Sequence, residues 1–211
     1  MIIAFDLNGT LTDPRGIGDP WGTPELGLVV LQTAVNSAGV DALLDRYRPF
    51  AEQLRAALGL RVQQRGLDPG GIDAAMARAA RLDPFEDTAS CLEQLDRAGH
   101  RLVVLTNSGA EAGRATLEAA GLAGHFEQIL GVDAVRSVKP HPRTYAYLLR
   151  QLEVAPDQVT VVAAHWWDVT GAKHAGMRTV WIARGEGFLS GSALEPDHRV
   201  PDLAGVARLF G

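Results

Sequence analysis

Short apolar segments alternate with segments of helical pattern from Pro84 onward. The expected helices cover residues 86–98, 110–120, 143–152 and 168–175, and several end at a glycine. The expected strands cover residues 101–105, 128–130, 159–163 and 178–182. This order is typical of a parallel, doubly wound sheet with helices on both faces. The sequence therefore predicts an α/β fold.

The segment between residues 13 and 83 shows helical spacing and no strand pattern. Residues 13–22 are rich in Gly, Pro and Asp, which predicts a linker that leaves the sheet. The expected helices cover 26–39, 41–59 and 72–80; Asp41 caps the second, and Pro49 kinks or restarts it. We therefore predict two domains, a core of 1–12 and 84–211 and an all-helical cap domain of 13–83 inserted into it.

Composition excludes several classes of function. The chain has 211 residues, enough for a full hydrophobic core, and a formal net charge of -5, which argues against binding of nucleic acid. The single cysteine, Cys91, excludes an internal disulfide. The first residues lack the positively charged region and the long apolar segment of a signal peptide. No apolar segment of the sequence approaches the roughly 18 residues of a membrane span. We expect a cytoplasmic protein that does not enter a membrane.

The first five residues are apolar and are followed by Asp6 and, three residues later, by Gly9. A glycine a few residues after a short apolar run favours a strand that ends in a turn. Asp6 would then lie at the carboxyl end of a strand, where open α/β sheets bind ligands. Burial of a lone carboxylate there costs free energy unless a cation compensates it. The alternative is that Asp6 and Asn8 serve only an Asx turn or a helix cap.

Three other expected strands also end in polar residues. The segments are Thr106-Asn107-Ser108, Ser137-Val138-Lys139-Pro140 and Ala164-His165-Trp166-Trp167-Asp168. Because the carboxyl ends of parallel strands meet at one edge of a sheet, these side chains are expected to converge with Asp6 on one crevice. They would supply a nucleophile, amide and hydroxyl donors, a cation and a second carboxylate.

The four segments resemble the four motifs of the haloacid dehalogenase superfamily. They are Asp6-Leu7-Asn8-Gly9-Thr10, Leu105-Thr106-Asn107, Lys139-Pro140 and Trp167-Asp168-Val169-Thr170-Gly171-Ala172. Within the superfamily, Lys139-Pro140 followed by Arg143 and Tyr145 is most similar to the L-2-haloacid dehalogenases. The resemblance covers nearly the whole chain and implies a Rossmann-like core, a helical cap and a covalent aspartyl intermediate.

The resemblance also implies roles for individual residues. Asp6 would displace halide from C2 of a 2-haloacid to form an ester, and Lys139 would keep the pKa of Asp6 low. Water activated by Asp168 or His165 would then attack the ester. Four further residues would contact the substrate or line the site: Thr10, Thr106, Asn107 and Tyr145. Two alternatives stay open, because Asp168 could cap the following helix and His165 could be a structural residue.

Departures from the superfamily pattern decide between reaction types. Asn8 stands where the phosphatases of the superfamily carry a second aspartate, and Ala164 stands where they carry an acid that helps to hold Mg²⁺. Few hard oxygen ligands therefore remain for a metal ion, and we predict chemistry without a metal or another cofactor. The dehalogenases carry an arginine on the first cap helix near the position of Leu31. Its absence leaves Arg15 or another residue to bind halide and carboxylate.

The expected partner is a small-molecule substrate, with a short 2-substituted carboxylic acid as the candidate. A homodimer is also expected, because related enzymes are commonly dimers. One alternative function is a Mg²⁺-dependent phosphatase of small phosphomonoesters. The other is a non-catalytic binding protein on the same fold, since folds outlast functions.

Overall fold

The computed structural model describes all residues from 1 to 211 and contains one six-stranded parallel sheet. The strand order is β3-β2-β1-β4-β5-β6. The strands are β1 (Ile2–Phe5), β2 (Arg101–Thr106), β3 (Gln128–Gly131), β4 (Val159–Ala163), β5 (Arg178–Ile182) and β6 (His198–Val200). The prediction of a Rossmann-like, doubly wound parallel sheet is confirmed.

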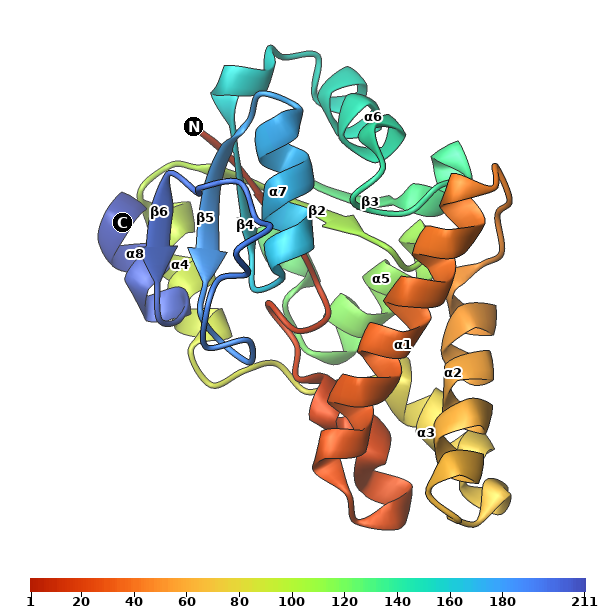
Figure 1. Cartoon of the computed structure of the whole chain (residues 1–211). Coiled ribbons are helices and arrows are strands. Elements are labelled where there is room, and N and C mark those ends of the chain that lie inside the picture. Colours follow the sequence, from red (N-terminus) through yellow and green to blue (C-terminus); the bar gives the residue numbers. More distant parts are fainter.

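Helices cover both faces of the sheet because the apolar residues of each strand alternate between the two faces. Helices α6 (Pro142–Leu152) and α7 (Trp166–His174) cover one face of the sheet (Figure 1), and Ile2 and Ala4 of β1 belong to the core cluster on that side. Ile3 and Phe5 face the side covered by α4 (Thr88–Arg97), α5 (Ala110–Ala119) and α8 (Leu203–Phe210). Short 3₁₀ turns complete the core: η3 (Ala123–His125), η4 (Val132–Val135) and η5 (Pro156–Gln158).

The sheet topology places Asp6 at the point where ligands bind in folds of this kind. Strand β1 pairs with β2 on one side and with β4 on the other, so the strand order changes direction beside β1. The crevice at such a switch point lies outside the carboxyl ends of the strands. Asp6 directly follows β1, and its backbone N–H donates to Val162 of β4 at 3.1 Å.

The inserted helices lie together to one side of the sheet (Figure 1). They are η1 (Pro14–Trp21), α1 (Pro24–Leu43), α2 (Phe50–Gln64), η2 (Pro69–Gly71) and α3 (Ile72–Ala79). The two segments that join them to the core are hydrogen-bonded to each other: Asp13 N–H donates to Asp83, and Phe85 N–H donates to Leu11. The helical insert is therefore attached through a pair of adjacent connections.

Two helix ends in the insert differ from the predictions. Gly39 and Gly59 were expected to end helices, but α1 continues to Leu43 and α2 to Gln64. Glycine in a helix costs about 1 kcal/mol relative to alanine, which packing between α1 and α2 outweighs. Asp41 does not cap the second helix; its carboxylate accepts hydrogen bonds from Arg48 and Gln53 and so connects α1 to α2.

Three further predictions are corrected. The expected linker 13–22 forms η1, which Asp13 caps by accepting from Arg15 N–H.

Helix α7 begins at Trp166 and not at residue 168, so His165 is its N-cap and Asp168 lies in its first turn. The alternative that Asp168 is only a helix cap is therefore wrong. Strand β6 and helix α8 were not expected, because β6 is short and mostly exposed.

Helix α1 is long and apolar enough, by length and composition alone, to cross a membrane. The sequence analysis expected no apolar segment long enough to span a membrane, because it predicted that this helix ends at Gly39. In the structure the helix continues to Leu43. In the structure its buried residues, among them Leu26, Val30 and Ala34, pack in the core cluster shared with α2 and the sheet. Core helices of water-soluble proteins can have the same length and apolar composition.

Candidate active site

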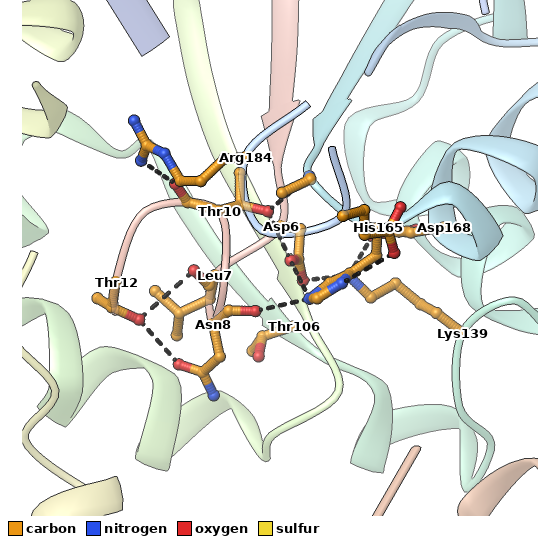
Figure 2. A network of polar contacts seen from close by, with 12 residues as sticks. Asp6, Leu7, Asn8, Thr10, Thr12, Thr106, Lys139, His165, Asp168 and Arg184 are labelled. Carbon is orange, nitrogen blue, oxygen red and sulfur yellow. Dashed lines mark hydrogen bonds and ion pairs between the residues drawn. The ribbon is translucent and has the colours of Figure 1, made fainter. Parts of the chain in front are cut away.

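Asp6 lies at the centre of a network of charged and polar side chains (Figure 2). It is 5% exposed. One carboxylate oxygen, Oδ1, accepts a hydrogen bond from Lys139 Nζ at 2.7 Å, and the other, Oδ2, accepts from Thr10 Oγ1 at 2.8 Å. His165 Nε2 lies 3.9 Å from Oδ2. The carboxylate is thus held by two hydrogen-bond donors, and the imidazole ring of His165 lies close to it.

Lys139 connects two carboxylates, that of Asp6 directly after β1 and that of Asp168 in the first turn of α7. Its ammonium donates to Asp6 Oδ1 and Asp168 Oδ2, each at 2.7 Å, and to the Leu105 carbonyl at 2.8 Å. An ammonium has three donors, so all of its hydrogen-bonding capacity is used. The side chain is 1% exposed, and its backbone N–H donates to Asn107 Oδ1. Lys139 is therefore held rigidly between Asp6 and Asp168.

Tyr145 supports Asp168 from behind and does not face the substrate side. Its hydroxyl donates to Asp168 Oδ1 at 2.7 Å, and the side chain is fully buried. Tyr145 lines neither of the two cavities beside Asp6. The structure therefore places the Tyr145 hydroxyl on the second carboxylate, which it orients, and contact between Tyr145 and a substrate stays a prediction.

The two carboxylates differ in acidity although they share one ammonium. Burial disfavours ionisation of Asp6, but the charges of Lys139 and His165 outweigh burial and lower the pKa of Asp6 below its ordinary value. Burial raises the pKa of Asp168, and the Asp6 charge adds to that rise. Burial disfavours the ammonium of Lys139, but Asp168 and Asp6 together raise its pKa. Asp6 is therefore the carboxylate that ionises more readily, and Asp168 is the one that accepts a proton more readily.

Thr10 positions Asp6 and does not line the cavities. Its hydroxyl donates to Asp6 Oδ2 and accepts from the Ala164 N–H at 3.0 Å, and the residue is fully buried. The single donor of this hydroxyl is used on Asp6, so the structure gives Thr10 a positioning role, and contact between Thr10 and a substrate stays a prediction.

A small cavity of about 20 Å³ lies directly over Asp6. Thr106 and Asn107 line it, as predicted for residues that contact a substrate, although the contact itself stays a prediction. Asn107 Oδ1 is occupied by the Lys139 N–H, so its amide NH₂ is the end left to donate. The cap supplies an apolar wall of Leu31, Val35 and Phe50.

His165 lies beside Asp6 and lines the same cavity. Its Nε2 is 3.0 Å from the Asn8 carbonyl, and its Nδ1 is 3.7 Å from Glu186 Oε1. The imidazole ring stacks on Trp167, with centroids 4.9 Å apart and an interplanar angle of 9°. The structure therefore places His165 in the candidate site, with both ring nitrogens facing acceptors.

A larger cavity of about 470 Å³ adjoins the small one and shares Leu31, Val35, His165 and Trp167 with it. Arg15 lines this larger cavity but is not free, since its Nε donates to Asp13 at 2.8 Å. Arg15 also does not line the small cavity over Asp6. Whether Arg15 takes the place of the arginine that the superfamily resemblance puts near Leu31 therefore stays a prediction.

Comparisons with known proteins agree with this geometry. The family model for haloacid dehalogenase-like hydrolases matches residues 1–176. This chain belongs to that family. The (S)-2-haloacid dehalogenase of Pseudomonas sp. (strain YL) is 30% identical over 99% of this chain and 93% of its own length.

Two further similarities bear on the activity of this haloacid dehalogenase-like hydrolase. The structure of L-2-haloacid dehalogenase from Xanthobacter autotrophicus with chloropropionic acid covalently bound has a TM-score of 0.88 and 29% identity, and the match covers 99% of this chain and 98% of that one. A phosphoserine phosphatase of Thermus thermophilus is 32% identical over 89% of this chain and 76% of its own length.

The hydrolase has no group of three or more His, Cys, Asp or Glu side chains arranged to hold a metal ion. Asn8 Oδ1 accepts from the Thr12 hydroxyl at 3.0 Å, and Ala164 offers only its backbone N–H, which donates to Thr10. The two positions at which the phosphatases of the superfamily carry acids thus offer no carboxylate here. The residues present do not fit a divalent cation with a full set of oxygen ligands.

Two residues of the site were missed by sequence reasoning. Trp167 lines both cavities, and its indole N–H has no hydrogen-bond partner. Glu186 lies in the loop after β5, and its Oε1 is 3.7 Å from His165 Nδ1. No sequence signal identifies Glu186, because the contact depends on how that loop folds over the start of α7.

Proposed function

We propose that this hydrolase removes halide from 2-haloacids and produces 2-hydroxyacids. The observation that carries the proposal is the buried set Asp6, Lys139 and Asp168 under a small cavity with amide and hydroxyl donors. The family membership and the covalent chloropropionic acid complex of the Xanthobacter relative support it.

In the first step Asp6 attacks C2 of the haloacid. The Oδ2 oxygen forms a bond to C2, the carbon–halogen bond breaks, and the halide leaves with the bonding pair. Thr106 and the NH₂ group of Asn107 line the cavity where the substrate carboxylate would lie. Displacement at C2 inverts its configuration and leaves an ester on Asp6.

In the second step water attacks Cγ of the Asp6 ester, and the acyl–oxygen bond breaks. The oxygen that leaves Cγ takes up one proton of the water by way of Asp168, which gives a 2-hydroxyacid with the inverted configuration. The other proton is released to solvent as the Asp6 carboxylate is restored. Asp168 accepts the proton that the water loses, because its pKa is raised by burial. Lys139, whose ammonium contacts both carboxylates, lies on the route of that proton.

Substrate entry requires movement of the cap. The small cavity of about 20 Å³ has room for about one water molecule, which is less than a haloacid occupies. Leu31 and Val35 of α1 separate it from the larger cavity. We propose that these residues move apart from Trp167 when substrate enters and close over it during the reaction.

A Mg²⁺-dependent phosphatase is the second candidate, and the similarity to a phosphoserine phosphatase is the observation that favours it. Asn8 and Ala164 count against it, because they remove the acid–base group and a metal ligand at once. The cytoplasmic location, the homodimer and the absence of nucleic-acid and membrane partners stay predictions.

We expect halide release from L-2-chloropropionate at the same rate with EDTA as with added Mg²⁺. The reason is that neither step uses a cation other than those of the protein. Ion chromatography of chloride checks this, beside hydrolysis of an aryl phosphate under the same conditions. Phosphate release that EDTA abolishes, without chloride release, would favour the phosphatase.

A further inference from the structure

The small cavity over Asp6 has one ionisable lining residue besides Asp6 itself, and that residue is His165. The other lining residues are Asn8, Leu31, Val35, Phe50, Thr106, Asn107 and Trp167. None of these seven side chains carries a charge. Among the residues that line this cavity, His165 is therefore the one that can carry a positive charge.

The charges already present do not suit an anionic substrate. Asp6 and Asp168 carry one negative charge each when ionised, and Lys139 balances only one of them. The three donors of Lys139 are all occupied by protein acceptors. A 2-haloacid brings its own carboxylate, and the leaving halide adds a further anion. Such a substrate needs a second cation near Asp6.

The contacts of His165 favour its charged form. Nε2 faces a backbone carbonyl at 3.0 Å, and a carbonyl can only accept, so this nitrogen carries a proton. Nδ1 faces the Glu186 carboxylate at 3.7 Å, and a carboxylate also only accepts when ionised. Only the imidazolium form has a donor at both positions.

The ring and its carboxylate are both held in place. Trp167 stacks on one face of the ring, and Gly9 lies so close that a Cβ there would be 2.7 Å from Nε2. Glu186 Oε2 accepts from the Trp166 N–H at 3.0 Å and from the Trp181 indole N–H at 3.3 Å. Glu186 is thereby fixed at the start of α7 with Oε1 toward the ring.

We propose that Glu186 holds His165 as an imidazolium, and that this imidazolium is the cation that offsets the charge of an anionic substrate and of the departing halide. The proposal rests on the haloacid function above. His165 then acts by its charge and not as the base that accepts the water proton. Glu186 is a positioning residue.

The acidity of His165 agrees with this role. Burial lowers its pKa, but Glu186, Asp6 and the Asn8 carbonyl outweigh burial, so the pKa lies above its ordinary value of 6.5. The cation is therefore present below that raised pKa and is lost as the pH rises through it. Of the arginines that line the adjoining larger cavity, Arg15 pairs with Asp13 and Arg184 with Asp87, while Arg61 donates to the uncharged side chains of Thr33 and Gln64. Helix α1 presents only Leu31 and Val35 to this cavity.

The test compares Glu186→Gln with Glu195→Gln. The amide introduced by Glu186→Gln keeps an acceptor for the Trp166 and Trp181 donors but loses the charge. Glu195 pairs with Arg199 on the surface of the same loop and does not contact the site, so its variant is the control. Two measurements are made on each protein: the imidazole titration of His165 by NMR, assigned from a His165→Asn variant, and the pH dependence of kcat/KM for L-2-chloropropionate.

We expect Glu186→Gln to lower the pKa of His165 by about one unit, as loss of a close opposite charge does. At pH values above both pKa values, kcat/KM should then fall about tenfold, and at lower pH it should approach the value of the parent. Glu195→Gln should change neither measurement. A His165 that is neutral at the pH of maximal activity, or a Glu186→Gln variant that shifts neither titration nor pH profile, would overturn the proposal. The NMR titration does not depend on turnover, so it still decides the charge of His165 if no halide is released.

Discussion

Asp6→Asn is expected to reduce kcat/KM for halide release by at least about 10⁴-fold, as removal of a covalent nucleophile does. The amide has nearly the shape of the carboxylate but cannot form the ester with C2. Lys139 keeps its contact with Asp168, so the fold should survive the change. Chloride release from L-2-chloropropionate, followed over hours at high enzyme concentration, measures the remaining activity.

Asp73→Asn is a suitable control for that experiment, because Asp73 is exposed on α3 and pairs only with Arg55. It should leave turnover unchanged. Turnover by Asp6→Asn above about a tenth of the parent rate would contradict the role of Asp6. If the parent releases no halide from any 2-haloacid and Asp6→Asn binds ligands as tightly as the parent does, the non-catalytic alternative gains support.

Lys139→Met is expected to reduce both activity and stability. The change leaves Asp6 and Asp168 buried without a cation, and removal of one partner from a buried ion pair costs about 3–5 kcal/mol of unfolding free energy. Activity should fall on the order of 10³-fold, because Asp6 is then no longer held ionised at neutral pH. Urea unfolding followed by circular dichroism measures the first effect, and chloride release the second.

The sign of the pH dependence distinguishes this variant from the parent. In the parent the lowered pKa of Asp6 contributes stability above its unfolded pKa, near 3.8, and that contribution is lost as the pH falls through the folded value. The raised pKa of Lys139 contributes stability that is lost only as the pH rises through the folded value, above 10.5. In Lys139→Met the two carboxylates raise each other's pKa, so the folded state binds more protons than the unfolded state. Its stability should therefore increase as the pH falls from 8 toward about 5.

Lys173, the other lysine of the chain, provides the matched control. It pairs with Asp197 at the surface, where such pairs contribute about 0–1 kcal/mol. Lys173→Met should therefore change the unfolding free energy little and leave the pH dependence as in the parent. Equal losses for the two lysine variants would contradict the role of Lys139.

The sheet and the centre of the site could be predicted because both follow from local patterns. Each of Asp6, Lys139 and Asp168 comes shortly after a short apolar strand, and parallel strands bring their carboxyl ends together. The parallel sheet and the place of Asp6 at the end of its first strand therefore required no knowledge of side-chain packing.

The remaining details depend on tertiary contacts that no local pattern records. Gly39 is accommodated within α1, although a glycine favours a helix end in isolation. Thr10 and Tyr145 were expected to meet the substrate, but their hydroxyls are directed to Asp6 and Asp168. Glu186 reaches His165 only because the loop after β5 folds back over α7.

The role of His165 shows why residue type alone does not decide chemistry. A histidine beside a nucleophile suggests a base, since its ordinary pKa lies near neutral pH. Here Nε2 faces a carbonyl and Nδ1 faces a carboxylate, so the geometry favours a cation. Only the arrangement of acceptors around the ring separates the two roles.

A single turnover in ¹⁸O-labelled water, with enzyme in excess over L-2-chloropropionate, tests the central claim most directly. If water attacks Cγ of an Asp6 ester, the label enters the Asp6 carboxylate, and the 2-hydroxyacid of that turnover stays unlabelled. The tryptic peptide that ends at Arg15 contains Asp6, and its mass should rise by one ¹⁸O for ¹⁶O exchange. Label in the 2-hydroxyacid and an unlabelled Asp6 peptide would show that water displaces halide directly, and would contradict the covalent mechanism.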